Sequence, residues 1–208
     1  VPADEKKRIL FILPWTAIGG AEIFDFNLIK GLKQKNYEIS VITTQKSDYD
    51  LRQEVEQYVE EYFDLTSFLK RKDWASFIAY IIKSRRINLV FFSNSYYGYY
   101  VLPWLKCQFK EIPFVDYIHS ENWTLRNGGK PKDSNAVADY IDATYTCTEY
   151  LKNLMYQTMK RNVKNVKTVY IGTDTDYFNP ETELEKDDEL KEKYKGKKVI
   201  LLPCRVVH

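Results

Sequence analysis

The chain has 208 residues, of which 44% are hydrophobic and 29% are charged, so it can form one complete α/β domain with a sizeable core. The net charge of +2 gives no indication of nucleic-acid binding, and no basic patch accompanies a known nucleic-acid-binding signature. Three cysteines (Cys107, Cys147 and Cys204) lack metal or redox spacing, and no signal peptide or membrane-length apolar run occurs. These features predict a cytoplasmic protein with free thiols.

The first segment of the chain alternates between strand and helix patterns. Residues 8–13 (RILFIL) form a nearly continuous apolar run, typical of a strand covered on both faces. Residues 21–35 carry apolar side chains at helical spacing, and residues 37–43 (YEISVIT) predict the next strand. Two further helices are predicted over residues 50–61 and 74–84.

The alternation continues to residue 171. The predicted elements are strands at 87–92, 113–119, 143–147 and 166–171, helices at 96–109 and 149–160, and a loop at 120–133. This pattern predicts a Rossmann-like, doubly wound, mostly parallel sheet of about seven strands. The expected order of its first six strands is 3-2-1-4-5-6.

The composition changes near residue 181. Residues 181–198 are mostly charged and predict a solvated helical connector between domains. Residues 199–203 (VILLP) then predict a buried strand. We therefore expect a domain over residues 1–180, a connector over 181–198, and the first strand of a second domain over 199–208. The alternative is that 199–203 forms the last strand of a single domain.

Three segments are expected to meet at the carboxyl edge of this sheet, where ligands of open α/β sheets bind. They are residues 15–20 after the first strand, Ser93-Asn94-Ser95 after a central strand, and His119-Ser120-Glu121 after the next. We predict one cleft there for an acceptor and a diphosphate. Its predicted lining residues are Ile18, Gly19, Gly20, Ser95, His119 and Glu121.

Gly19 and Gly20 lie between a strand and a helix, where a backbone without side chains can approach a diphosphate and helix amides can bind it. The alternative is a simple tight turn. A G-x-G-x-x-G fingerprint is absent, and Thr43-Thr44 stands where a dinucleotide site has an acid, which argues against NAD. No phosphate-loop motif occurs, which argues against a phosphate-loop NTPase.

His119 ends a mostly apolar strand and is one of two histidines in the chain. Such a residue is either a structural histidine or, at this edge of the sheet, a functional one. Glu121 could orient its ring or bind a ligand hydroxyl.

Four segments, in chain order, resemble glycosyltransferase family 4, the large group 1 family with the GT-B fold. Gly19-Gly20-Ala21-Glu22 resembles its GGAE signature, and residues 147–152 resemble a VSEYLK helix start. Residues 171–174, with Tyr177-Phe178 and Pro180, resemble the NGVD and FxP segment that ends the N-terminal domain. Residues 201–205 resemble LFVGR, which opens the C-terminal domain; Cys204 replaces the usual glycine and Ile171 the usual asparagine.

The resemblance implies that the chain is the N-terminal, acceptor-binding half of a retaining glycosyltransferase. It implies that Gly19 and Gly20 face the donor diphosphate, that His119 lies near the transferred sugar, and that Arg205 contacts the leaving phosphates. Glu22 would hold the loop against the helix. Ile18, Ser95 and Glu121 are the predicted acceptor-binding residues.

The expected donor is a UDP- or GDP-sugar, and the expected acceptor is a glycan or a lipid-linked glycan. Amide and cationic donors stabilise the leaving diphosphate, so no metal or other cofactor is expected to be required. The alternative function is a non-catalytic nucleotide- or sugar-binding module.

Residues 74–84 offer two interpretations. Basic residues flank this apolar helix at 70–72, 83, 85 and 86, as in helices that lie on anionic membranes, and many acceptors of the family are lipid-linked. This interpretation predicts peripheral contact with the inner face of the membrane. The alternative is a helix that covers the sheet and has charged ends.

Overall fold

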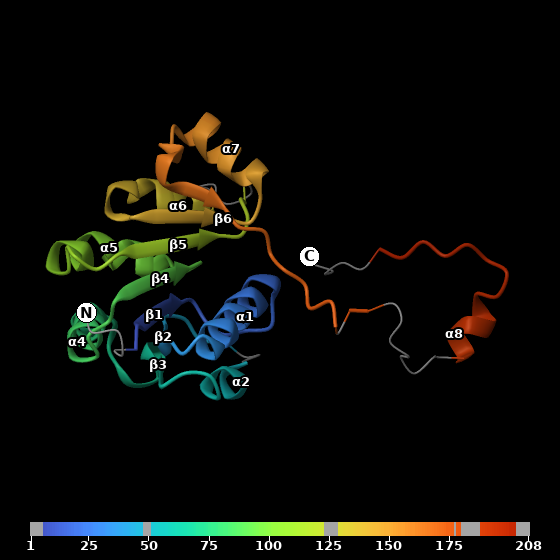
Figure 1. Ribbon diagram of the computed structural model, residues 1–208, viewed down its shortest axis with the longest axis horizontal. Coiled ribbons are helices and arrows are strands. Elements are labelled where there is room, and N and C mark those ends of the chain that lie inside the picture. Colours follow the sequence, from blue (N-terminus) through green and yellow to red (C-terminus); the bar gives the residue numbers. More distant parts are fainter. Residues whose placement is uncertain (1–5, 48–50, 123–128, 177, 180–187, 203–208) are drawn as a thin grey trace. The chain divides into compact units, whose positions relative to one another are not determined.

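The computed structural model describes residues 6–47, 51–122, 129–176, 178–179 and 188–202. A single sheet of seven parallel strands organises the fold, with strand order β3-β2-β1-β4-β5-β6-β7 (Figure 1). The strands are β1 (Arg8–Leu13), β2 (Glu38–Thr43), β3 (Glu61–Asp64), β4 (Leu89–Ser93), β5 (Phe114–Ile118), β6 (Ala143–Thr146) and β7 (Val166–Thr168).

Alternation along the strands divides the core into two clusters, one on each face of the sheet. In β1, Ile9, Phe11 and Leu13 belong to one cluster, while Leu10 and Ile12 belong to the other. All five side chains are buried, because parallel strands in this fold are covered on both faces. The continuous apolar pattern of β1 is therefore explained by two covering layers of helices.

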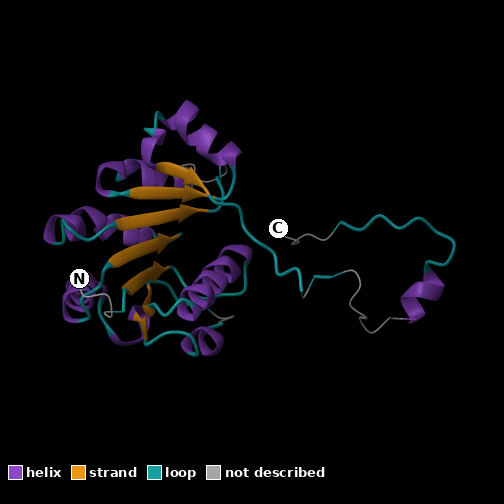
Figure 2. Cartoon of the chain, viewed as in Figure 1, coloured by secondary structure: helices purple, strands orange, loops and turns teal. Residues whose placement is uncertain are grey.

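Helices lie on both sides of the sheet (Figure 2). The cluster around Phe11 includes residues of α1 and α2, whereas the cluster around Leu10 includes residues of α3, α4, α5 and α7. The α-helices are α1 (Gly20–Gln34), α2 (Arg52–Glu56), α3 (Leu65–Phe68), α4 (Trp74–Ser84), α5 (Tyr96–Gln108), α6 (Lys130–Ala136), α7 (Glu149–Met159) and α8 (Asp188–Lys193). Short 3-10 turns occur at Arg71–Asp73, Ala138–Tyr140 and Val163–Asn165.

The predicted doubly wound topology and the order of its first six strands are confirmed. The prediction of a helix over 50–61 is wrong at its C-terminal end, because the helix ends at Glu56 and β3 begins at Glu61. This strand is only four residues long and lies at the edge of the sheet, so it has little apolar signal. Paired with β2 along one side, it carries Tyr62 and Phe63 between two acids.

Two other predicted elements also differ from the structure. The loop predicted over 120–133 contains the start of α6, where Pro131 occupies the first turn of the helix and needs no amide donor there. The strand predicted over 199–203 is absent from residues 199–202, which pair with no strand among the described residues and expose Ile200, Leu201 and Leu202 to solvent. The remaining predicted strands are present, with β7 ending at Thr168 instead of residue 171.

The helix α4 covers the sheet. Its apolar residues Trp74, Ile78, Ile81 and Ile82 are buried in the core, so its apolar face is not available to a membrane. No helix within the described ranges combines the length and the apolar character needed to span a bilayer.

The chain divides into two compact units, Val1–Ile171 and Gly172–His208. The first contains the whole sheet. In the described part of the second, α8 is a short, fully exposed helix with acidic residues in its first turn and lysines in its last turn, an arrangement that complements the helix dipole. The domain boundaries predicted at 180 and 198 stay predictions.

Candidate functional site

The loops that follow β1, β2, β4 and β5 meet at the carboxyl edge of the sheet, as parallel strands require. Thr44, just after β2, shares a hydrogen bond of 3.0 Å between its Oγ1 and Ser95 Oγ, in the β4–α5 loop. Thr44 also donates to the carbonyl of Leu13, the last residue of β1. These bonds fix three loop starts relative to one another.

The β1–α1 loop ends at Gly19, the N-cap of α1, which has no side chain to cap the helix amides. Trp15 Nε1 donates to Glu22 Oε1 over 2.9 Å, so the start of the loop is tied to the first turn of the helix, as the family resemblance implies. Gly20 is exposed, and a Cβ added there would meet no heavy atom within 4 Å. The fold itself therefore places no demand for glycine at position 20. Ile18, next to this pair, is 60% exposed.

Ser95 is fully buried, and its hydroxyl caps α5 by accepting a hydrogen bond from the Gly98 amide at 3.0 Å. This bond and the hydrogen bond with Thr44 show that the Ser95 side chain stabilises the fold. The acceptor-binding role predicted for Ser95 stays a prediction. The preceding Asn94 has φ +53°, in the left-handed region that asparagine tolerates better than most residues. The chain thus turns sharply between β4 and α5 at this edge.

His119 lies directly after β5 and its side chain is 8% exposed. The ring contacts Phe24 of α1, edge to face at 5.1 Å between centroids, and Tyr117 at 4.7 Å. Ser93 Oγ lies 3.1 Å from Nε2, and the Cys147 thiol donates to the backbone carbonyl of His119. Burial lowers the pKa of His119 from 6.5 to about 4, so its imidazole is neutral at physiological pH.

Asp25 of α1 lies beneath this histidine and was not predicted from the sequence. Its carboxylate Oδ1 is 4.0 Å from His119 Nε2, and the residue is 3% exposed. Burial raises its pKa well above 3.8; the hydrogen bond with Ser93 acts in the opposite direction, and the charge of Glu22 raises the pKa further. An acid in an otherwise apolar stretch of a helix was the sequence signal for this position.

Glu121 is half-buried and does not orient the His119 ring. Among the described residues, Nδ1 of His119 has no hydrogen-bond partner, and Nε2 is paired with Ser93. One of the two roles predicted for Glu121 is therefore wrong, because the ring takes its orientation from the end of β4. Arg205, Cys204, Tyr177 and Pro180 lie outside the described residues.

A second unpredicted group is Lys130, the first residue of α6. Its ammonium lies over the ring of Tyr96, which opens α5, and 3.9 Å from Asp133 Oδ2. Burial lowers the pKa of Lys130 to about 7, while the nearby Asp133 acts to raise it. Sequence analysis did not identify Lys130 as a candidate, because it predicted a loop over residues 120–133 instead of a helix that begins at residue 130.

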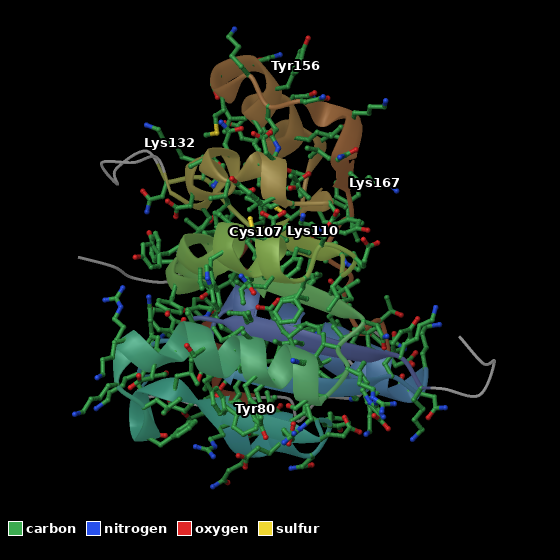
Figure 3. The ribbon with its side chains drawn as sticks, turned by 90° about the vertical axis from the view of Figure 1, so that its left-hand side faces the viewer. Tyr80, Cys107, Lys110, Lys132, Tyr156 and Lys167 are labelled. Carbon is green, nitrogen blue, oxygen red and sulfur yellow. The ribbon has the colours of Figure 1, made fainter. Side chains whose placement is uncertain are left out.

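Two pockets lie at opposite ends of the strands. One of about 250 Å³ lies at the carboxyl edge between the loops after β1, β2 and β3, lined by Trp15, Thr16, Gln45, Lys46, Asp64 and Ser67. A larger one of about 600 Å³ lies at the edge where the strands start, beside Lys6, Lys7 and Arg86. Figure 3 views the sheet from that second edge, with Cys107 and Lys110 at the end of α5. We place the candidate site at the carboxyl edge, where the glycine pair and His119 lie.

A comparison with protein families matches Glycosyltransferase Family 4 over residues 18–177. This range is most of the chain and begins at the loop that carries Gly19 and Gly20. The chain belongs to Glycosyltransferase Family 4. Within this family match lie the GGAE-like segment, His119, and the segments at 147–152 and 171–174. No curated protein sequence matches the chain.

Solved structures show the same fold. A glycosyltransferase from Rickettsia africae superposes with a TM-score of 0.66 and 18% identity, covering 91% of this chain and 49% of that one. Anabaena HepE, in complex with UDP and glucose, superposes with a TM-score of 0.64 and 14% identity, covering 90% of this chain and 50% of that one. MurG from Acinetobacter baumannii superposes with a TM-score of 0.52 and 14% identity, covering 84% of this chain and 48% of that one. The chain spans about half the length of these enzymes and has the Rossmann-like architecture of one half of a GT-B glycosyltransferase.

The candidate site of this Glycosyltransferase Family 4 chain contains three kinds of chemical group at one edge of the sheet. The N-terminus of α1 supplies amide donors that no side chain caps, with open space at Gly20 and the Glu22 carboxylate beside Gly19. The His119 imidazole and the Lys130 ammonium are the titratable groups there; burial lowers the pKa of both, and His119 Nδ1 and Lys130 Nζ are shielded from solvent. Within the described ranges, no three His, Cys, Asp or Glu side chains are grouped to hold a metal ion.

Proposed function

We propose that the whole protein transfers a sugar from a UDP- or GDP-sugar to a glycan or lipid-linked acceptor, with retention of the anomeric configuration. The observation that carries this proposal is the family match over residues 18–177, with the glycine pair and His119 at one edge of the sheet. Crystal structures of HepE with UDP and glucose, or with UDP-glucose, support a nucleotide-sugar donor.

The donor diphosphate binds at Gly19 and Gly20 in this proposal. Amides at the start of α1 are not used by the helix, and the helix dipole favours an anion there. The open space at the Gly20 Cβ position supports close approach of a phosphate to the backbone. The hydrogen bond with the Trp15 indole holds the Glu22 side chain beside Gly19, so the proposed approach of the phosphate is on the open side, at Gly20.

The two predicted catalytic residues, Arg205 and His119, have different roles in this proposal. Transfer builds negative charge on the leaving diphosphate, and Arg205 contacts it as the resemblance implies, so no metal cofactor is required. His119 lies near the transferred sugar, where a neutral ring can form a hydrogen bond with a hydroxyl. Ile18, Ser95 and Glu121 are the residues that we propose for the acceptor side of the site.

The protein acts in the cytoplasm in this proposal, and a lipid-linked acceptor brings it to the inner face of the membrane. Because the apolar face of α4 is buried against the sheet, contact with lipid requires another surface. The basic residues at 70–72 are exposed just before this helix and are the groups that an anionic surface would attract.

Incubating the full-length protein with a panel of UDP- and GDP-sugars and acceptors from its host tests the proposal. We expect nucleotide release coupled to glycan transfer, undiminished by a chelator, with the anomeric configuration of the product retained. Donor binding without turnover across the panel would instead identify a non-catalytic nucleotide- or sugar-binding module.

One variant, measured in two ways, separates catalysis from folding. His119→Ala should lower kcat by about 100-fold, the size of a typical acid–base or hydrogen-bonding contribution. Its melting temperature, measured on the same sample, should change little relative to that loss. If turnover per folded molecule is nearly intact and only the melting temperature falls, His119 is a core residue.

A further inference from the structure

The smaller pocket at the carboxyl edge takes no part in the proposed binding of the diphosphate. It lies between the loops that follow three neighbouring strands, and its lining includes Trp15 after β1, Gln45 and Lys46 after β2, and Asp64 at the end of β3. Pockets for drug-sized ligands measure about 300–1,000 Å³. With a volume of about 250 Å³, this pocket suits one small ring better than a longer chain.

The walls of this pocket are joined by hydrogen bonds between separate elements. Thr16 Oγ1 and the Tyr62 hydroxyl share a hydrogen bond of 2.7 Å, which connects the loop after β1 to β3. The Trp15 indole is held by its bond to Glu22. Because these walls are already fixed, a ligand that enters the pocket loses little free energy to ordering of the protein.

Three polar side chains of the lining have groups available for a ligand. Within the described ranges, the side chains of Gln45 and Lys46 form no hydrogen bond or ion pair. Asp64 uses only Oδ1, which accepts from the Thr66 amide at 2.9 Å and from the Thr66 hydroxyl at 2.6 Å. An amide, an ammonium and the second carboxylate oxygen together supply both donors and acceptors, as a ligand rich in hydroxyls requires.

The chemistry of the lining narrows the class of ligand. The apolar surfaces in it are chiefly the aromatic rings of Trp15 and Tyr62, and it includes no Val, Leu, Ile or Met that would contact a lipid tail. The formal charges of Lys46 and Asp64 cancel, so the lining has no excess positive charge for a phosphate or a carboxylate. A neutral sugar ring fits both features, because it carries hydroxyls around its edge and C–H groups on its faces.

We propose that this pocket binds a neutral sugar ring of the acceptor, with Asp64 Oδ2 accepting from its hydroxyls and with Gln45 and Lys46 donating to its oxygens. Trp15 connects the pocket to the donor side, because it lines the pocket and also holds the Glu22 side chain beside Gly19. A ring in the pocket therefore lies next to the loop that carries the glycine pair. Sugar binding follows from the lining, whereas its use for the acceptor rests on the proposed function.

Saturation-transfer difference NMR of the full-length protein tests sugar binding without any need for activity. The probes are the methyl glycosides of glucose, galactose, mannose and N-acetylglucosamine. We expect at least one to give ring-proton signals that persist when UDP is saturating, because donor and acceptor bind together. No signal from any of the four, or signals that UDP removes, would overturn the proposal.

Asp64→Asn is the matched variant. Its amide oxygen still accepts from the Thr66 amide and caps α3, while an NH₂ group replaces the acceptor Oδ2. The melting temperature should therefore stay close to that of wild type, and the glycoside signals should be lost. Signals that survive in Asp64→Asn would overturn the proposal.

Two controls define the specificity of the pocket. Asp73→Asn makes the same chemical change at an exposed acid outside the lining, and it should keep the wild-type signals. Methyl glucuronide and glucose 6-phosphate should give weaker signals than the neutral glycosides. Stronger signals from either would show that the pocket takes an anionic ligand and would overturn the proposal of a neutral ring.

Transfer kinetics test the use of the pocket by the acceptor. Asp64→Asn should raise the KM for the acceptor by about 10- to 100-fold, the effect of losing a hydrogen bond to a charged group, and leave the KM for the donor unchanged. If the wild-type protein binds a glycoside as expected but transfers no sugar, the proposed function fails and the sugar pocket stands. If transfer is normal and Asp64→Asn leaves the KM for the acceptor unchanged, the acceptor pocket alone fails.

Discussion

Trp15 Nε1 donates a hydrogen bond to Glu22 Oε1 over 2.9 Å and so ties the loop after β1 to the first turn of α1. The loop between them carries Ile18, Gly19 and Gly20. A hydrogen bond to a charged group contributes about 1.5–3 kcal/mol, so this bond limits opening of the loop. Glu22→Ala should therefore speed amide hydrogen exchange of residues 17–20 and raise the KM for the nucleotide-sugar.

Glu22→Gln is the control, because its amide oxygen still accepts from the indole. In Glu22→Gln, the amides of residues 17–20 should exchange at nearly the wild-type rate. Slow exchange in Glu22→Ala as well would mean that the loop is held by other contacts and that the Trp15–Glu22 bond is incidental.

Gly98 shows where the fold requires glycine. A Cβ at this position in α5 would lie 2.6 Å from Phe92 Cδ1, and Phe92 is fully buried in β4. Gly98→Ala should destabilise the protein by about 1–3 kcal/mol, the usual cost of overpacking. Gly31→Ala, in α1 with no heavy atom within 4 Å of its Cβ, should stabilise it by about 0.5–1 kcal/mol. Urea unfolding midpoints check both changes, and the reverse order would contradict the packing described here.

The strands that lie inside the sheet could be predicted because both of their faces are covered. Continuous apolar runs such as 8–13 are visible in the sequence for this reason, and their order follows from the βαβ alternation. The edge strand β3 was missed because a strand of four residues with a partner on one side needs little apolar pattern. Residues 199–202 have the apolar pattern of a strand, but no strand in the described part of the chain pairs with them.

For the site, sequence reasoning located the ends of strands but not the partners beneath them. His119 was found because it interrupts an apolar run at a strand end. Its partners Asp25 and Ser93 are distant in sequence, and only the packing of α1 against β4 and β5 brings them to the ring. Lys130 was missed because a Gly-Gly-Lys-Pro stretch, typical of a loop, is also an acceptable helix start when proline occupies the first turn.

The buried imidazole predicts a specific dependence of stability on pH. The folded-state pKa of His119 is about 4, below the ordinary 6.5, so the unfolded chain binds more protons between these values. The contribution of His119 is present above pH 6.5 and is lost as the pH falls toward 4, by up to about 3 kcal/mol at about 1.4 kcal/mol per pKa unit. Because the pKa of Asp25 is raised in the folded state, its contribution to stability falls as the pH rises above 3.8, which is opposite to the effect of His119.

His119→Gln isolates the histidine from that opposing slope. The difference in unfolding free energy, wild type minus His119→Gln, should rise as the pH increases from 4 to 6.5 and stay level above it. Denaturant unfolding at a series of pH values measures this difference. A flat difference across the window would mean that the ring titrates normally in the folded protein.

The most direct test of the central claim, that the glycine pair at the start of α1 holds a nucleotide-sugar diphosphate, is to measure donor affinity and melting temperature of Gly20→Val in the full-length protein. No heavy atom lies within 4 Å of the added Cβ, so the melting temperature should stay close to that of wild type. The new side chain would occupy the space that the diphosphate needs, and donor affinity should fall by at least about 100-fold, which corresponds to about 2.7 kcal/mol. Wild-type affinity and turnover in a normally folded Gly20→Val protein would contradict the account.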